Sequence, residues 1–290
     1  DARAHGRRCF LSTPNLNFLV ASQRSAAFRD SVCRSDLSVA DGMPLIWLSR
    51  LLGVPLRERV SGSGLFDHLR QRSSQAWHVF FFGGQPGAGP AACAALGRGG
   101  GTMRPAGHLN PGFGSAEQMS RTDWIDAINA SGADFVVVSL GSAKGQEWIS
   151  RNLARLRAPV VSHLGAVVNF VAGTVARAPR WMQRSGLEWL WRIKEEPALW
   201  KRYALDGLAL LRLLLTRVLP LALLQRRGDA AAAKAPPPRL EWPDGRGAAD
   251  LVLAGAWRDE RLGPLREAFT TLLARGGNVT LDLRGVTHLG

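Results

Sequence analysis

The chain has 290 residues, which is enough for one large domain or two ordinary ones. A hydrophobic content of 46% and a total of 32 glycines favour a globular α/β protein over a disordered chain. The formal net charge of +14 indicates an anionic partner, either a nucleic acid, a phosphate-bearing substrate or a membrane surface. The three cysteines lie far apart and form no CxxC pair, which argues against a disulfide framework and favours a reducing, cytosolic setting.

Short apolar runs alternate with helical patterns between residues 10 and 165. Strands are expected at 10–12, 37–40, 77–82, 134–139 and 159–164, and helical patterns end at Asp30 or cover 43–52, 66–71, 91–96 and 146–149. Near-continuous apolar strands separated by helices are typical of a parallel sheet that is covered on both faces. The sequence therefore predicts an α/β fold, a Rossmann-like layered domain with a mostly parallel sheet.

The stretch Ser38-Val39-Ala40-Asp41-Gly42-Met43-Pro44 joins one of these strands to the next helix. An apolar run ends at Asp41, and the proline that follows is well placed in the first turn of a helix. Asp41 is therefore expected at the edge of the sheet where open α/β domains bind their ligands. The alternative interpretation is that Asp41 only caps the following helix.

The other predicted strands end at similar positions, which are Thr13, Gly83-Gly84, Gly141 and Gly165. Glycine-rich turns allow backbone N–H groups to approach a phosphate, and helix N-termini favour its negative charge. Each glycine alone indicates a tight turn, but together they predict a nucleotide or nucleotide-sugar pocket. The pattern Gly83-Gly84-Gln85-Pro86-Gly87 is neither a Walker loop nor a G-x-G-x-x-G fingerprint. The sequence holds no Asp-x-Asp, which weakens the case for a metal-bridged diphosphate.

Residues 177–203 interleave arginines with tryptophans, and residues 177–234 carry twelve basic and five acidic residues, half of the net charge. Such mixtures are typical of a membrane interface or a nucleic-acid surface. A plainer interpretation is an exposed ion-pair ladder, because Arg184, Glu188 and Arg192 follow one another at helical spacing.

Residues 208–224 are rich in leucine but contain Arg212 and Arg217. A spanning helix needs about 20 largely uncharged residues, so the pattern favours an amphipathic helix at 206–227 that lies in the headgroup layer. The alternative is a helix packed on the domain or on a partner. Residues 228–239 are predicted to be a linker, and 240–290 to form part of a small α/β module, with a strand at 249–254, a helix at 262–274 and a strand at 278–283.

An ordered set of motifs over residues 8–205 resembles the WecG/TagA/CpsF glycosyltransferase family. The motifs are Thr13-Pro14-Asn15, Asp41-Gly42-Met43-Pro44, Arg59-Val60-Ser61-Gly62-Ser63, Gly83-Gly84, residues 141–147, Gly165, Ala172-Gly173, residues 177–181, Gly186-Leu187-Glu188-Trp189 and Arg202-Tyr203. The resemblance implies an inverting, metal-independent enzyme that moves a sugar, of the N-acetylmannosamine type or a related hexose, from a UDP-sugar to an undecaprenyl-diphosphate-linked acceptor. It also implies a peripheral place on the cytoplasmic face of the bacterial plasma membrane, and no nucleic-acid partner.

The same resemblance implies roles for individual residues. Asp41 resembles the general base, and Thr13 and Arg59 complete the catalytic group. The implied donor-binding residues are Asn15, Gly83, Gly84, Gly141, Gln146 and Glu147. An appendage at 177–205 is implied to help close the site and to contact the acceptor and its diphosphate through Arg184, Arg192 and Arg202. The chain departs from the family pattern at an inserted glycine, Gly145, and at Asn169, where an acidic residue is frequent.

The tail from about residue 240 resembles part of a STAS domain, on Leu251-Val252-Leu253-Ala254-Gly255 and residues 279–287. This resemblance implies a protein partner for the tail. The altered turn at 143–147 supports an alternative function, that of a non-catalytic regulatory protein with a degenerate transferase fold that acts through this tail. The chain opens without Met and stops within the pattern of the tail, which predicts a fragment, and the sequence leaves the oligomeric state open, a homo-oligomer included.

Overall fold

The computed structural model describes residues 6–72, 75–234, 237–242, 250–257, 262–275 and 279–289. The chain divides into two compact units, Asp1–Leu215 and Thr216–Gly290. The boundary between them lies inside the helix predicted at 206–227, because that helix is continuous and contributes residues to both units.

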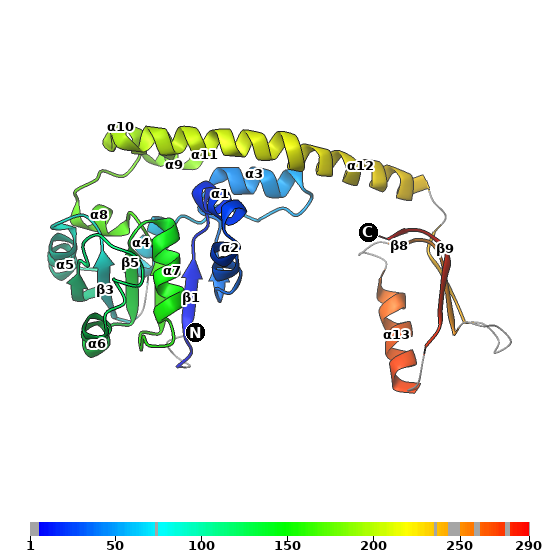
Figure 1. The fold of residues 1–290 in the computed structure, drawn as a ribbon, viewed down its shortest axis with the longest axis horizontal. Helices are drawn as coiled ribbons and strands as arrows, with labels where there is room; N and C mark the ends of the chain where they lie inside the picture. The colour runs from blue at the N-terminus through cyan, green and yellow to red at the C-terminus, as the bar shows by residue number, and fades with distance from the viewer. Residues whose placement is uncertain are drawn as a thin grey trace. The chain divides into compact units, whose positions relative to one another are not determined.

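The first unit is built on a six-stranded parallel sheet (Figure 1). Its strands are β1 (Cys9–Ser12), β2 (Leu37–Ser38), β3 (Trp77–Gly83), β4 (Met103–Leu109), β5 (Phe135–Ser139) and β6 (Val160–His163). They lie in the order β2-β1-β6-β5-β3-β4, and every neighbouring pair is parallel. The predicted fold class is therefore confirmed. The sequence does not predict β4, because this edge strand mixes Arg, Pro, Gly and His with its apolar residues.

Helices surround this sheet. They are α1 (Leu16–Arg24), α2 (Ala26–Cys33), α3 (Met43–Leu51), α4 (Gly62–Arg72), α5 (Ala88–Arg98), α6 (Thr122–Ala130), α7 (Ser142–Asn152) and α8 (Val167–Ala172). Successive side chains of a strand point to opposite faces. Phe80 and Phe82 of β3 accordingly share one core with α6 and α7, whereas Val79 and Phe81 share the other core with α4, α5 and α8. Both faces are covered, so the polar chemistry of this unit is confined to the edges and ends of the strands.

A run of helices follows the sheet. It consists of α9 (Arg180–Ser185), α10 (Glu188–Glu195), η1 (Pro197–Leu199), α11 (Trp200–Leu213), the π-helical segment η2 (Leu214–Val218) and α12 (Leu219–Lys234). By length and composition, the helix Pro197–Arg227 could cross a membrane. In its most apolar stretch of 18 residues, 11% are buried inside the protein. The position of this helix relative to a bilayer stays a prediction. Residues 228–234 are helical where the sequence predicts a linker, because the alanine run there favours helix over a loop.

The second unit contains a three-stranded sheet in the order β7-β8-β9. β7 (Arg239–Glu241) is antiparallel to β8 (Leu251–Trp257), and β9 (Leu281–Leu289) is parallel to β8. Helix α13 (Gly263–Arg275) packs on this sheet through Ala268 and Leu272, against Leu251, Leu253 and Trp257. Strand, helix and strand thus follow in the predicted order. The resemblance to a STAS domain stays a prediction.

Candidate active site

Asp41 lies in a segment that is fixed by its backbone on both sides. The Val39 N–H donates to Ser12 O over 3.0 Å, and the Asp41 N–H donates to Pro14 O over 2.7 Å. On the other side, the Val60 N–H donates to Ala40 O over 3.0 Å. The turn after β1 and the loop before α4 therefore clamp Asp41 at the carboxyl edge of the sheet, where the sequence predicted it.

The Asp41 carboxylate does not cap the helix that follows it. The N-cap of α3 is Gly42, which has no side chain to accept a hydrogen bond. Asp41 Oδ2 instead accepts a hydrogen bond of 3.1 Å from the N–H of Gly62, the first residue of α4. Gly62 packs closely there, because a Cβ would lie 2.8 Å from Leu164 Cδ2 and would require this side chain to shift. The alternative interpretation of Asp41 as a cap of the next helix is thus wrong.

The electrostatic surroundings make Asp41 a stronger base than an ordinary aspartate. Burial raises the pKa of its carboxyl to about 6, although the Gly62 N–H and the Arg59 guanidinium lower that pKa in part. The negative charge of Glu188 raises the pKa of Asp41 further, and Arg177 lowers it. At neutral pH the carboxylate is ionised and can accept a proton, which is the state that a general base requires.

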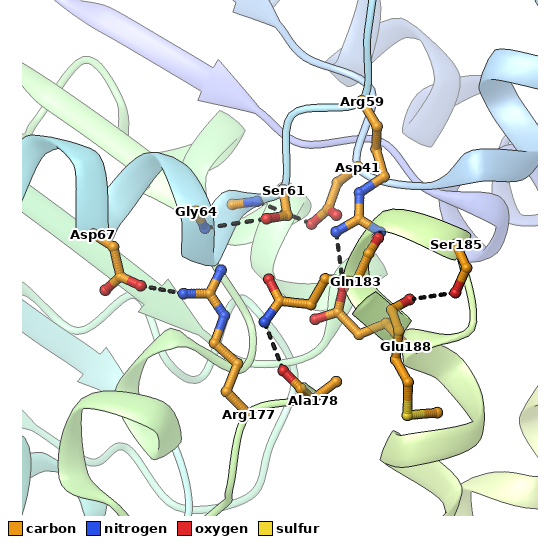
Figure 2. A network of polar contacts seen from close by, with 12 residues as sticks. Asp41, Arg59, Ser61, Gly64, Asp67, Arg177, Ala178, Gln183, Ser185 and Glu188 are labelled. Carbon is orange, nitrogen blue, oxygen red and sulfur yellow. Dashed lines mark hydrogen bonds and ion pairs between the residues drawn. The ribbon is translucent and has the colours of Figure 1, made fainter. Parts of the chain in front are cut away.

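Arg59 is held beside Asp41 by the appendage (Figure 2). Its Nη2 forms an ion pair of 2.8 Å with Glu188 Oε2, and its Nη1 donates to Gln183 O over 3.2 Å. Glu188 is thus occupied by a residue 129 positions earlier in the chain. The predicted ladder is therefore wrong at its step from Glu188 to Arg192, because Arg192 pairs with Glu196 instead, over 2.6 Å, while the Arg184 side chain lies outside the described residues.

A second set of contacts fixes the same segment of the appendage to α4. Arg177 forms an ion pair with Asp67, and Gln183 Nε2 donates to Ala178 O over 2.6 Å. Ser61 Oγ accepts from the Gly64 N–H over 3.1 Å and so caps the start of α4 (Figure 2). Ser61 thus holds the first turn of α4, which carries the Gly62 N–H, and the pair of Arg177 with Asp67 ties the same helix to the appendage.

Thr13 and Asn15 lie in the turn that carries Asp41. Thr13 is 5% exposed and its Oγ1 donates to His163 O over 3.3 Å. Asn15 caps α1, because its Oδ1 accepts from the Phe18 N–H over 3.2 Å. Both residues approach the site, since a Cβ added at Gly42 would lie 3.7 Å from Asn15 Cβ and one added at Gly62 would lie 3.6 Å from Thr13 Oγ1.

The three predicted donor-binding glycines all have positive φ, but for different reasons. A Cβ on Gly83 would lie 2.6 Å from Ser139 O, and one on Gly84 would lie 2.8 Å from Val168 Cγ1. Gly141 has a φ of +84° and open space around its Cβ position. The first two glycines therefore serve close packing at the ends of β3 and β5, whereas Gly141 opens the N-terminus of α7 to solvent.

Gln146 and Glu147 do not join the group around Asp41. Gln146 is fully buried and donates from Nε2 to Ser12 Oγ over 2.7 Å, while Glu147 is exposed. Gln146 is thus linked to the site through Ser12, the neighbour of Thr13 in the chain. The inserted Gly145 has a packing reason, because a Cβ there would lie 2.2 Å from His163 Cδ2.

The three arginines predicted for the acceptor are dispersed. Arg192 lies over the Phe170 ring of α8 at 5.4 Å, and Arg202 lies over the Tyr203 ring at 5.0 Å and is exposed. Arg184 belongs to α9, and its side chain lies outside the described residues. Neither Arg192 nor Arg202 contacts Asp41, so their roles stay predictions.

The sequence did not predict three residues that contact Arg59 or Asp41 in the structure, which are Glu188, Gln183 and Gly62. Glu188 and Gly62 stood within motifs that signalled the family, but nothing in their local pattern indicated a contact with Arg59 or Asp41. Among the described residues, no three His, Cys, Asp or Glu side chains gather as a metal site would require. The absence of a metal cofactor stays a prediction.

An aspartate with a raised pKa and an arginine thus lie at the carboxyl edge of a parallel sheet, where open α/β sheets bind ligands, and the open N-terminus of α7 is of a kind that suits an anion. The sequence model of the Glycosyl transferase WecG/TagA/CpsF family matches residues 1–222. The chain belongs to this family and is a glycosyltransferase.

Two curated relatives carry the description N-acetylglucosaminyldiphosphoundecaprenol N-acetyl-beta-D-mannosaminyltransferase, and each is 26% identical to the chain over 194 residues. The match to the protein of Bacillus spizizenii (strain ATCC 23059 / NRRL B-14472 / W23) covers 67% of this chain and 74% of the relative. The match to the protein of Bacillus subtilis (strain 168) covers 66% of this chain and 73% of the relative.

Proposed function

We propose that the protein transfers a hexose, of the N-acetylmannosamine type or related, from a UDP-sugar to an acceptor linked to undecaprenyl diphosphate. The observation that carries this proposal is the Asp41 carboxylate, with its pKa raised to about 6 by burial, beside an arginine at the carboxyl edge of the sheet. The printed descriptions of the two relatives support the acceptor class and the sugar type.

In the proposed reaction, Asp41 accepts the proton of an acceptor hydroxyl while that oxygen attacks the anomeric carbon of the donor. The bond from this carbon to the diphosphate oxygen breaks, UDP leaves with the bonding electron pair, and direct displacement inverts the configuration. Negative charge grows on the leaving diphosphate, and Arg59 together with the N-terminus of α7 supplies positive charge to stabilise it. The enzyme needs no metal in this scheme.

Binding of UDP and turnover test the proposal together. UDP at about 100 times its dissociation constant should stabilise the chain by about 2.7 kcal/mol and raise its melting temperature by several degrees. Release of UDP from a UDP-sugar in the presence of a short lipid-diphosphate sugar acceptor should continue at the same rate in excess EDTA. The regulatory alternative predicts neither stabilisation nor release, and a rate abolished by EDTA and restored by a divalent cation would contradict the metal-free scheme.

We further propose that Pro197–Arg227 holds the protein on an anionic membrane as a helix in the headgroup layer. Its exposed leucines include Leu208, Leu211 and Leu215, and the arginines of the same helix suit lipid phosphates. A lipid-linked acceptor would meet the site at this surface. The spanning alternative has the same length and composition in its favour.

The double variant Leu211→Glu with Leu215→Glu tests the membrane proposal in the full chain. The variant loses two leucines that the proposal inserts into the lipid, and it brings two negative charges to an anionic surface. Binding to vesicles of phosphatidylglycerol and phosphatidylethanolamine should therefore weaken more than about tenfold. Phe113→Glu is the matched control, because Phe113 is fully exposed elsewhere in the unit. Co-sedimentation measures both. Unchanged binding of the double variant, or a wild-type chain that resists carbonate extraction, contradicts the interfacial position.

A further inference from the structure

Helix α11 carries a buried carboxylate. Asp206 is 6% exposed, although Leu205 and Leu208 beside it are 63% and 65% exposed. A carboxylate taken out of water is costly unless hydrogen bonds satisfy it. The direction of Asp206 into the protein is therefore a specific feature of this helix, which packs against α1.

Asn17 of α1 satisfies this carboxylate. Its Nδ2 donates to both oxygens of Asp206, over 3.4 Å to Oδ1 and 3.2 Å to Oδ2. The other end of the same amide, Oδ1, accepts a hydrogen bond from Ser142 Oγ. Both ends of Asn17 are used, so its orientation is fixed, and one chain of hydrogen bonds connects α11 to α7.

Ser142 is the first residue of α7, and the turn before it has few restraints of its own. The N-cap Gly141 has a φ of +84°, makes no side-chain capping bond and has open space at its Cβ position. The N–H groups of a first helical turn point at a bound anion, so the position of this turn bears on anion binding. The hydroxyl of Ser142 is thus the side-chain anchor of a turn that faces the carboxyl edge of the sheet.

We propose that Asp206 is a positioning residue, which acts through Asn17 and Ser142 to fix the first turn of α7 for the donor diphosphate. The inference rests on the proposed function for the nature of the ligand. It means that the packing of α11, which is part of the proposed membrane helix Pro197–Arg227, influences the affinity of the site for its donor.

A double-mutant cycle on the full chain tests this chain of contacts. Asp206→Ala and Asn17→Ala should each raise the KM for the UDP-sugar about fivefold and leave kcat within about twofold, and the double variant should be no worse than either single variant. Asp206→Asn keeps an oxygen acceptor for Asn17 and should recover most of the wild-type KM. Ser22→Ala is the control, because Ser22 Oγ bonds only within α1, to Phe18 O.

A second measurement needs no substrate. Hydrogen exchange of the amides at 142–146 should be faster in Asp206→Ala, and in the milder variant Ser142→Ala, than in the wild type or in Ser22→Ala. Additive KM effects, a loss of kcat alone, or unchanged exchange at 142–146 overturns the proposal. If the variants exchange faster but the wild-type chain neither binds UDP nor releases it from a UDP-sugar, the chain of hydrogen bonds is supported and the proposed function is contradicted.

Discussion

Asp41→Asn is expected to lower kcat by about 10²- to 10⁴-fold, because the amide cannot accept the proton of the acceptor hydroxyl. The fold should remain, since the amide oxygen of Asn can still accept the Gly62 N–H. UDP binding, measured by thermal shift, should be nearly unchanged. The melting temperature at pH 7 should not fall, because the variant removes a charge that burial disfavours.

The control for this variant is Asp36→Asn. Asp36 Oδ2 also accepts one backbone N–H, that of Phe10, over 2.7 Å, but it lies before β2 and outside the site. We expect its kcat to match that of the wild type. An Asp41→Asn enzyme with more than about a tenth of the wild-type kcat would remove Asp41 from the role of base.

The pH dependence of the wild type follows from the same group. The folded protein holds the Asp41 proton more tightly than an ordinary aspartate does, because burial raises its pKa to about 6. The base is therefore lost as pH falls through about 6, and kcat/KM should decline over that interval rather than near pH 4. This decline, the acidic limb of the pH profile of kcat/KM, should be absent from the residual activity of Asp41→Asn.

Arg59→Ala is expected to lower kcat/KM by about 10²- to 10³-fold, the size of effect seen when one preorganised group that stabilises transition-state charge is removed. The acidic limb should also move to higher pH, because Arg59 lowers the pKa of Asp41 and the variant leaves Glu188 as an unpaired like charge. The two effects have one cause, the loss of positive charge between two carboxylates.

Glu188→Gln provides the opposite shift. It removes the charge that raises the pKa of Asp41, so the acidic limb should move to lower pH while Arg59 keeps a hydrogen-bond partner. The control is Arg121→Ala, which breaks an exposed ion pair with Asp123 away from the site. Limbs that move in the same direction in Arg59→Ala and Glu188→Gln would contradict the electrostatic assignment.

Much of the fold follows from local sequence patterns. The apolar runs at β1, β3, β5 and β6 and the helical patterns between them define a layered parallel sheet, because both faces of such strands must be buried. The same logic places Asp41 at the carboxyl edge, where a strand gives way to Gly42 and Pro44. β4 escapes this logic, since an edge strand needs no continuous apolar run.

The partners of the site residues belong to the tertiary structure. Local spacing suggested a ladder from Glu188 to Arg192, but the fold brings Arg59 to Glu188 from 129 positions away. Local sequence also allowed Asp41 to cap α3, and only the tertiary structure shows that its carboxylate accepts the Gly62 N–H across the loop instead. Hydrogen bonds and ion pairs between distant segments depend on the order of the strands, which periodicity does not encode.

The sequence by itself therefore determined the fold class and the family, and it predicted Asp41 as the residue around which the site is built, because these depend on periodicity, turn residues and the order of motifs. Only the tertiary structure decided that Asp41 is a partly buried carboxylate with a raised pKa, that the appendage holds Arg59, and that Gln146 lies in the core. The physical reason is that burial and charge pairing are properties of segments brought together, and each of these three facts joins residues from different elements.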